Sequence, residues 1–271
     1  MAELRDVQLA ELSILEEIHR ICEQHNIKYA LSCGSMLGAV RHKGFIPWDD
    51  DLDIYMSFFE FKKFEKVFSS ETCFLQSVKT DPNMPFIMYK VRKNNTIMTE
   101  DDFIGLDMHQ GVWVDIFIYF NAGKNEKTKR IQAKLMTLLQ TIRCRGVNKL
   151  NDRENIVQKI VDRFPMKMAR NVDDFIFFLA RAIGSKKSNE YYMTVNNVFE
   201  KLFYPKSVID GQSLYEFEGR QFYGLKNADG YLTYEYGKNY MTPKKYGSHL
   251  SSFDNVILWL RKIYECYNNF S

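Results

Sequence analysis

A run of acidic residues that leads directly into an apolar strand constrains this chain more than any other feature. Residues 49–56 read DDDLDIYM, and their alternation predicts a strand over residues 52–56. Asp51 and Asp53 are two residues apart, so both side chains point to one face of that strand, with Cβ atoms roughly 7 Å apart. An unpaired charge beside buried apolar residues is costly. Because hard cations prefer carboxylate ligands, the pair predicts a site for Mg²⁺, with Mn²⁺ as the alternative.

A glycine–serine turn lies upstream of the acidic run. Residues 29–31 predict a short strand, and Gly34 and Ser35 predict the turn after it, with Ser35 as the N-cap of the helix that follows. Free N–H groups and the dipole at a helix start favour an anion such as phosphate. A Gly-Ser pair alone is typical of an ordinary turn, and Asp49 and Asp50 alone are typical of a solvated loop. Together with the carboxylate pair, the turn predicts a joint site for phosphate and metal.

A third carboxylate interrupts the strongest predicted strand. Residues 111–119 read GVWVDIFIY, with aliphatic side chains on one face and Asp115 among aromatic side chains on the other. No helix begins here, so Asp115 is not a helix cap. A buried aspartate must be paired, protonated or bound to a metal. We therefore predict that Asp115 is the third metal ligand, beside Asp51 and Asp53.

Basic residues follow two further predicted elements. A strand over residues 87–92 places Lys90 and Arg92 on one face, where they could neutralise a phosphate or form an exposed sheet face. Residues 121–149 predict a basic amphipathic helix, which is typical of a solvated face over a core stripe. Contact with an anionic membrane surface or with a pyrophosphate-linked acceptor is the alternative for this helix.

Composition sets limits on function. The 271 residues are 45% hydrophobic and 15% aromatic, and a net charge of +3 is too weak to argue for a nucleic-acid partner. The five cysteines are odd in number and lack C-x-x-C spacing, which argues against a disulfide framework or a zinc site and for a reducing cytosol. The N-terminus lacks a signal-peptide pattern and the apolar runs are too short to span a bilayer, so we expect a cytoplasmic protein.

Hydrophobic periodicity predicts the remaining elements and three parts of the chain. Further helices are predicted over residues 7–25, 58–68, 154–164, 166–183, 189–199 and 254–267, and further strands over residues 74–78, 96–98, 202–205 and 215–223. We expect a catalytic core over residues 1–122, a helical region facing substrate or acceptor over residues 123–200, and a segment over residues 201–271 that packs back on the core. The final helix is expected to dock within the chain or across a dimer.

Several motifs together resemble the LicD family of phosphotransferases, which belongs to the nucleotidyltransferase-fold superfamily. The most specific is the block WDDDLD at residues 48–53, because a bare D-x-D would not be informative. The matching segments are spread over nearly the whole chain, at residues 34–38, 41–53, 91–96, 114–117, 217–219 and 236–241. Two positions depart from the family pattern: Gly224, where a proline-led segment is expected, and Lys244, where a second proline is common. These departures concern C-terminal substrate contacts and leave the metal site unaffected.

The resemblance implies an α+β fold: a nucleotidyltransferase-like mixed β-sheet flanked by helices, with an added helical layer and a C-terminal β/helix segment. It also implies metal-dependent transfer of phosphocholine from CDP-choline to a sugar hydroxyl of a teichoic acid or lipopolysaccharide precursor, with release of CMP. The partners would be this CDP-activated donor and a lipid-linked saccharide acceptor, met at the inner face of the cell membrane. CDP-ribitol, CDP-glycerol or an NTP as donor, and a non-catalytic nucleotide-binding role, are the alternatives. A homodimer and peripheral membrane contact stay open.

Residue roles follow as a hypothesis. In the resemblance, Asp51 and Asp53 match the metal pair and Asp115 the third acidic position, where it is also placed to take the proton of the acceptor hydroxyl. Gly34 and Ser35 would hold the donor phosphates. Positive charge for the transition state is expected from Arg41, His42 and Arg92. Aromatic faces for a trimethylammonium group are expected among Trp48, Tyr55, Tyr89, Trp113 and Tyr119.

Overall fold

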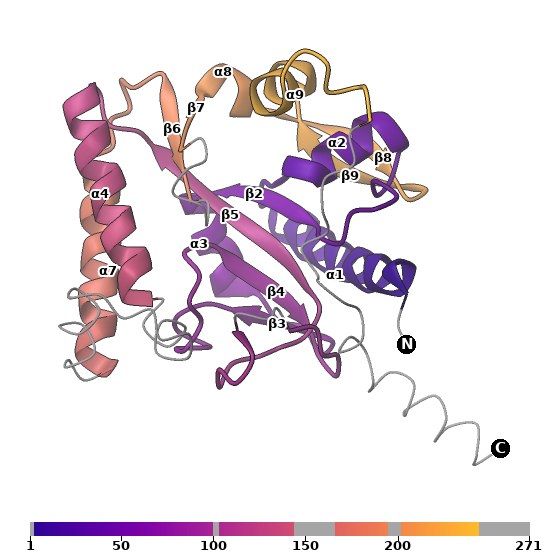
Figure 1. Ribbon diagram of the computed structural model, residues 1–271, viewed down its shortest axis with the longest axis horizontal. Coiled ribbons are helices and arrows are strands. Elements are labelled where there is room, and N and C mark those ends of the chain that lie inside the picture. Colours follow the sequence, from indigo (N-terminus) through magenta and orange to yellow (C-terminus); the bar gives the residue numbers. More distant parts are fainter. Residues whose placement is uncertain (1–2, 100–102, 144–165, 195–201, 244–271) are drawn as a thin grey trace.

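A computed structural model describes residues 3–99, 103–143, 166–194 and 202–243 (Figure 1). Within these residues, nine strands form one mixed sheet whose main path runs β3-β4-β5-β2-β1-β9-β8, with β6 beside β5 and β7 beside β6. The strands are β1 Ala30–Leu31, β2 Asp53–Ser57, β3 Cys73–Gln76, β4 Tyr89–Lys93, β5 Trp113–Asn121, β6 Glu190–Met193, β7 Phe203–Pro205, β8 Gln212–Phe217 and β9 Arg220–Leu225. The expected α+β fold with a mixed sheet flanked by helices is confirmed.

Two parallel strand pairs lie at the centre of this sheet. β2 is parallel to β5 and β1 is parallel to β9, whereas the other pairs are antiparallel. Parallel neighbours need a long connection between them, and the chain between β2 and β5 supplies α3, β3 and β4. The strands β6 to β9 come from the last third of the chain and extend the sheet on both sides of the central strands.

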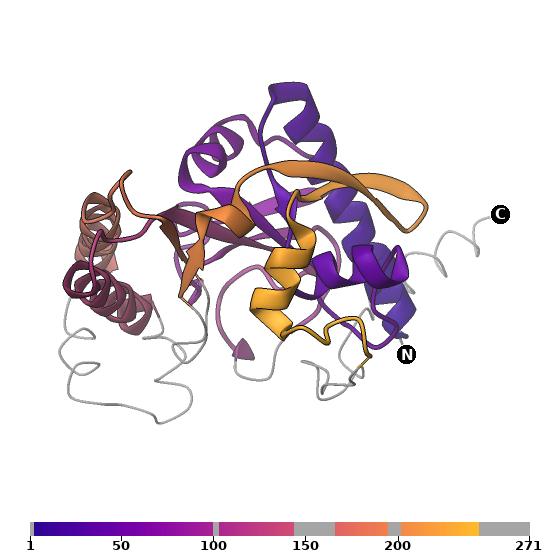
Figure 2. The same ribbon diagram turned by 90° about the horizontal axis from the view of Figure 1, so that it is seen from above.

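Helices pack on the sheet and beside it. They are α1 Leu4–His25, α2 Cys33–His42, α3 Phe58–Val67, α4 Glu126–Arg143, α7 Met166–Ala182, α8 Lys206–Ile209 and α9 Ala228–Tyr236. α1 packs against β4, β5 and α3, whereas α2 contacts β2, β8, β9 and α9. α4 and α7 lie side by side at one end of the molecule in both views (Figures 1 and 2). This pair is the added helical layer that the sequence predicts.

The core lies between the central strands and α1. Leu15 and Ile18 on the apolar stripe of α1 are fully buried, as are Val114 and Ile116 of β5. The opposite face of β5 is also covered, and Asp115 on that face is only 8% exposed. A central parallel strand commonly has both faces covered, so the polar residue that interrupts β5 is removed from water.

A tight turn joins β8 to β9 and returns the chain to β1 in the middle of the sheet. Glu218 and Gly219 both have positive φ, 53° and 72°, as the turn of a two-residue hairpin requires. Sequence periodicity predicts a single strand over residues 215–223, and the structure has a hairpin there instead. Since β9 pairs with β1 at Leu31↔Gly224, the hairpin brings the C-terminal segment beside the chain that leads into α2.

Other differences from the predicted elements have local causes. Residues 189–199 were predicted to be helical, but residues 190–193 form β6, because Tyr191 and Tyr192 suit a strand and pair with β7. Residues 96–98 form no strand, and the hydroxyl of Thr96 instead accepts the N–H of Val112 and donates to the carbonyl of Lys93. The predicted helices over residues 154–164 and 254–267 lie outside the described residues.

None of the helices in the described ranges is both long and apolar enough to cross a membrane.

Candidate functional site

Two predicted metal ligands lie directly beside each other in the sheet. In the parallel pair of β2 and β5, Asp53 is the register partner of Asp115. Asp53 is 5% exposed. Burial, reinforced by the charges of Asp51 and Asp115, raises the pKa of Asp53 well above its usual range. Two buried carboxylates on adjacent strands are therefore held together at a site that favours either a proton or a cation.

The loop before β2 adds a second group of carboxylates. Oxygens of Asp49, Asp50 and Asp51 all lie within 4.8 Å of one another, the spacing of groups that could hold a metal ion. Asp50 is only 2% exposed, so the loop is not the solvated turn that its sequence alone suggests. Burial and the neighbouring Asp51 raise the pKa of Asp49 to about 8. This loop and the strand pair form one acidic centre, because Asp51 and Asp49 both act on the pKa of Asp53.

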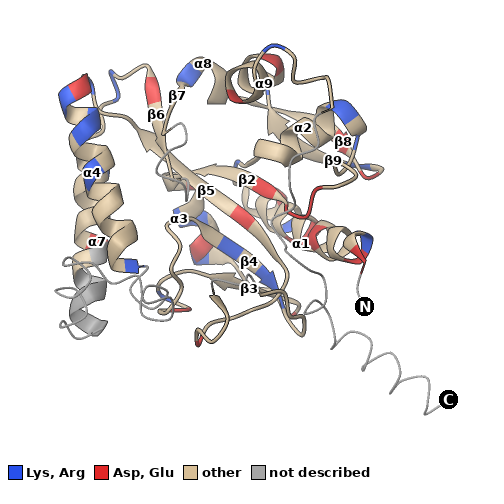
Figure 3. Ribbon diagram, in the orientation of Figure 1, with Lys and Arg blue, Asp and Glu red and all other residues tan. Residues whose placement is uncertain are grey.

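The predicted trio of Asp51, Asp53 and Asp115 is thus divided between two neighbouring parts of this centre. Asp53 and Asp115 are register partners, whereas Asp51 groups with Asp49 and Asp50. Sequence reasoning missed the contribution of Asp49 and Asp50, since it treated the start of the acidic run as a loop in water. In Figure 3 the acidic loop leads into β2, and the acidic position on β5 lies next to the basic β4.

Asp115 already has two partners from the protein. The Nζ atom of Lys90 on β4 lies 2.9 Å from Asp115 Oδ1, and Trp113 Nε1 donates a hydrogen bond of 3.1 Å to Oδ2. Lys90 is itself buried, at 1% exposure, between the rings of Trp113 and Phe86, with its Nζ atom 4.1 and 4.4 Å from their centroids. These contacts hold the Asp115 carboxylate in one orientation.

Arg92 lies in the interior of the sheet. It is 1% exposed, and its guanidinium donates to Gln76 Oε1 at 2.6 Å and to the carbonyl of Gly111 at 2.6 Å. It also stacks on Trp113 at 5.0 Å from the ring centroid. The exposed basic face that was one alternative for Lys90 and Arg92 is therefore absent from β4. The described contacts of Arg92 tie β4 to β3 and to the chain before β5.

The start of α2 supports the acidic centre from the other side. The Ser35 hydroxyl accepts a hydrogen bond of 2.8 Å from the backbone N–H of Asp53. Ser35 is not the N-cap that the sequence suggests, because α2 begins at Cys33 and its N-cap is Ser32. A Cβ atom at Gly34 would lie 2.5 Å from Asp49 Oδ2, so the glycine allows the carboxylate to approach the first turn of α2.

A buried tyrosine cluster holds α9 against α2. The Tyr231 hydroxyl of α9 accepts the backbone N–H of Cys33 at 3.0 Å and lies 2.9 Å from the hydroxyl of Tyr55. Tyr204 stacks on Tyr231 and donates to Glu235 at 2.8 Å. Tyr55 therefore serves packing here, and Tyr89 does the same by stacking on Phe61.

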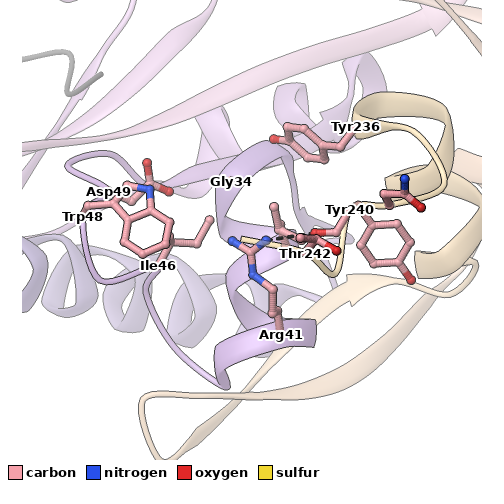
Figure 4. A pocket seen from close by; sticks show the side chains of 10 residues that line it. Gly34, Arg41, Ile46, Trp48, Asp49, Tyr236, Tyr240 and Thr242 are labelled. Carbon is pink, nitrogen blue, oxygen red and sulfur yellow. Dashed lines mark hydrogen bonds between the residues drawn. The ribbon is translucent and has the colours of Figure 1, made fainter. Parts of the chain in front are cut away.

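A pocket of about 110 Å³ opens beside the acidic loop, between α2 and the chain that follows α9. Trp48 and Asp49 lie on one side of it and Tyr236 and Tyr240 on the other (Figure 4). The pocket is lined by Gly34, Leu37, Arg41, Ile46, Trp48, Asp49, Tyr236, Asn239, Tyr240 and Thr242. Three of the substrate residues predicted from sequence, Gly34, Arg41 and Trp48, thus meet around one cavity.

Arg41 lines this pocket, and His42 follows it at the end of α2. Arg41 donates to the carbonyl of Tyr240 at 2.9 Å and to His42 Nδ1 at 3.3 Å, and the His42 ring meets Trp48 edge-on at 6.4 Å. Partial burial and the charge of Arg41 lower the pKa of His42. The last turn of α2 and the loop after it thereby place cationic, neutral and aromatic groups next to the acidic centre.

Sequence reasoning also missed Glu11. The pattern of the helix over residues 7–25 did not single it out, yet Glu11 is fully buried and neither of its carboxylate oxygens has a hydrogen-bond partner. Its spacing to Gln8, Leu15 and Ile18 puts it on the buried stripe of α1, which is the pattern that could have revealed it. Burial and the charges of Asp51 and the other aspartates of the centre raise the pKa of Glu11 well above its usual range.

The acidic centre fits a hard divalent cation. Its donors are carboxylate oxygens, which Mg²⁺ and Mn²⁺ prefer, and Asp49, Asp50 and Asp51 already lie within one ligand sphere of each other. The buried oxygens of Glu11 lack partners beside the same loop, as expected where a positive charge belongs.

Comparisons with known proteins identify the family of this chain. A model of the LicD/FKTN/FKRP nucleotidyltransferase domain matches residues 26–141, which contain the acidic centre. The chain is 32% identical over 250 residues to the lipopolysaccharide cholinephosphotransferase LicD of Haemophilus influenzae, a match that covers 86% of this chain and 90% of that protein. Uncharacterised proteins of Rickettsia prowazekii and Rickettsia typhi are each 48% identical over 46 residues, or 17% of this chain and 17% and 15% of theirs. This chain belongs to the LicD family.

Proposed function

We propose that this protein transfers phosphocholine from CDP-choline to a sugar hydroxyl of a lipid-linked precursor of a cell-surface glycan, with release of CMP. The Haemophilus relative is named a lipopolysaccharide cholinephosphotransferase, and its match covers nearly the whole of both chains. The observation that carries the proposal is the register pair Asp53 and Asp115, set beside the acidic loop and the pocket of Gly34, Arg41 and Trp48. A lipopolysaccharide-type acceptor is favoured by the relative, and a teichoic acid is the alternative.

The acidic centre would hold Mg²⁺ or Mn²⁺. Asp51, Asp53 and Asp115 are the ligands we assign, and Asp49 and Asp50 add the carboxylates that the structure brings beside Asp51. A bound divalent cation supplies neutralisation of the donor diphosphate and of the charge that develops on the leaving oxygen. Because the carboxylates are buried, their negative charges would destabilise the fold without a cation, and a bound cation would offset this cost.

The transfer itself needs a proton acceptor. The acceptor hydroxyl oxygen forms a bond to the phosphorus that carries choline, the bond from this phosphorus to the bridging oxygen breaks, and CMP leaves with the electron pair. We assign the proton of the hydroxyl to the Asp115 carboxylate. Lys90 and Trp113 keep that carboxylate in one orientation through the contacts at 2.9 and 3.1 Å.

The donor would lie across the start and end of α2. Gly34 and Ser35 lie in the first turn of α2, close to Asp49, where a helix start favours phosphate. Arg41 would supply positive charge from the last turn, and His42 beside it would supply a neutral ring nitrogen. Arg92 is buried in the sheet, so its positive charge would act on the donor phosphates only through the protein interior. The donor phosphates are therefore assigned to α2.

The choline head group would occupy the pocket of Figure 4. A trimethylammonium group binds to the faces of aromatic rings, and Trp48, Tyr236 and Tyr240 all line this pocket. Asp49 adds a carboxylate to the same wall. Trp48→Leu should therefore weaken the use of CDP-choline more than that of CDP-glycerol, which carries no cation.

A donor panel tests the proposal. Purified protein with Mg²⁺ and a saccharide acceptor extract is incubated separately with CDP-choline, CDP-ribitol, CDP-glycerol and CTP, and CMP and pyrophosphate are quantified. We expect CMP from CDP-choline, its loss with EDTA, and its loss in Asp53→Asn but not in Asp174→Asn, which changes an exposed aspartate on α7. Pyrophosphate from CTP without CMP from CDP-choline would reject the proposal in favour of nucleotidyl transfer.

A further inference from the structure

Glu11 is a buried acid that the mechanism above does not use. It lies in the middle of α1 with no exposed surface, and neither Oε1 nor Oε2 has a hydrogen-bond partner. Buried carboxyl oxygens almost always have partners, and an orphaned one is strongly unfavourable. A residue that only filled space at this position of the apolar stripe would be better apolar, like Leu15 and Ile18.

The side of α1 that carries Glu11 faces the acidic loop. Gln8, one turn earlier on the same side, donates from Nε2 to the carbonyl of Asp49 at 3.0 Å and to the carbonyl of Ile46 at 3.4 Å. Asp51 is the neighbour with the largest electrostatic effect on Glu11, followed by Asp50 and Asp53. The hydrogen bonds of Gln8 thus hold this side of α1 against the acidic loop, and Glu11 lies about one turn further along the same side.

All of the charges that act on Glu11 most strongly are negative, and they come from the loop and from β2. A proton would remove the charge of Glu11 but would leave its oxygens without partners. A cation with its bound water would offset the four negative neighbours and also satisfy the lone pairs of Glu11.

We propose that Glu11 is a further carboxylate of the cation site and binds the ion, or a water of its shell, from the α1 side of the loop over residues 49–51. The proposal rests on the proposed function only in taking the ion to be the one that the enzyme uses. Glu11 then links α1 to the acidic centre, so that binding of the ion joins the helix, the loop and β2. Removal of an acidic group that supports metal ligands commonly lowers metal affinity about 10- to 100-fold.

Direct measurement of Mn²⁺ binding tests this assignment without any donor. The free Mn²⁺ signal in electron paramagnetic resonance gives the Kd for the wild type, for the isosteric Glu11→Gln and for the apolar Glu11→Met. Glu23→Gln is the matched control, because Glu23 is exposed near the end of the same helix. Thermal unfolding in EDTA reports on the metal-free fold of each variant.

We expect Kd to rise about 10-fold or more in both Glu11 variants and to stay unchanged in Glu23→Gln. The metal-free melting temperature of Glu11→Gln should equal or exceed that of the wild type, because an orphaned acid is removed from among aspartates. Equal Mn²⁺ affinity in a folded Glu11 variant would overturn the proposal, and so would loss of the fold in both variants, which would make Glu11 purely structural.

The two proposals fail in different ways. Wild-type protein that binds no Mn²⁺ would overturn both the metal-dependent function and the role of Glu11. Normal CMP release with a Kd unaffected by Glu11→Gln would overturn the role of Glu11 alone. A donor panel that yields pyrophosphate, together with a raised Kd in Glu11→Gln, would reject the proposed function and support Glu11.

Discussion

Asp53 and Asp115 are register partners on the parallel strands β2 and β5, so two buried carboxylates lie side by side at the centre of the sheet. The hydrogen bonds of the sheet hold this relationship, because Asp115 N–H donates to the carbonyl of Leu52 at 2.9 Å. Neither side chain can move away without disturbing the strand pair. Backbone pairing therefore preorganises this pair, and the loop over residues 49–51 adds the other carboxylates of the acidic centre.

Replacing Asp53 should separate activity from stability. Asp53→Asn would remove a metal ligand that we propose, and we expect CMP release from CDP-choline to fall at least about 100-fold, beyond the loss typical of groups that only support a ligand. Because burial raises the pKa of Asp53, the neutral amide should leave the metal-free fold as stable as before. Steady-state CMP assays and melting in EDTA measure the two effects. Activity close to that of the wild type would show that Asp53 holds no essential ion.

Lys90 should matter for stability through its pairing with Asp115. Lys90→Met keeps a side chain that packs between Trp113 and Phe86 but leaves the Asp115 carboxylate buried without its ion pair. Breaking a buried pair in this way costs about 3–5 kcal/mol in free energy of unfolding. The double variant with Asp115→Asn should recover part of that loss in urea titrations. Equal stability of the single and double variants would argue against the coupling.

The metal-free protein should lose stability as pH rises. The pKa of Asp49 is about 8 in the fold against an ordinary value of 3.8, so between these values the folded state holds a proton that the unfolded chain has lost. The free energy of unfolding in EDTA should therefore fall from about pH 4 to about pH 8. Asp49→Asn should flatten this decline in urea titrations at several pH values. Wild-type stability that increases over the same range would contradict the assignment.

Two glycines of α2 should respond differently to alanine. In Gly34→Ala the new Cβ would meet only the Asp49 carboxylate, at 2.5 Å, and this side chain can rotate away. The better helix propensity of alanine stabilises the helix by about 1 kcal/mol, which offsets the cost of that rotation. In Gly38→Ala the Cβ would meet the backbone carbonyl of Gly44 at 2.4 Å, so the loop itself must shift. We expect Gly34→Ala to weaken Mn²⁺ binding with little change in melting temperature, and Gly38→Ala to lower the melting temperature. The reverse pattern would show that Asp49 does not belong to the ion site.

Local patterns predicted much of the fold. Strand alternation located β2 and β5, and helical spacing located α1, α3 and α7 to within a few residues at each end. The signals failed where tertiary pairing overrode them, as at Tyr191 and Tyr192, which read as helix and form β6. The turn at Glu218 and Gly219 was missed, because aromatic and polar residues are mixed on both sides of it and the whole segment resembles one strand.

The candidate site was predicted in part. Asp53 and Asp115 were identified because a carboxylate that interrupts an apolar strand has few structural explanations, and Gly34, Arg41 and Trp48 do meet at one pocket. The sequence pattern could not predict the environment of each side chain. Lys90 and Arg92 occupy the same strand face in the sequence pattern, yet one pairs with Asp115 and the other with Gln76.

The sequence by itself identified Asp51, Asp53 and Asp115 as candidates for the chemistry, and it located most of the strands and helices around them, because periodicity is a property of neighbouring residues. Only the tertiary structure decided which of those residues share a site. The parallel register of β2 and β5, the burial of the loop over residues 49–51 under α1, and the approach of Glu11 to that loop all join segments that are distant in the chain. Packing between such segments sets burial and electrostatic neighbours, and these decide whether an acidic residue is a solvated surface group or a ligand.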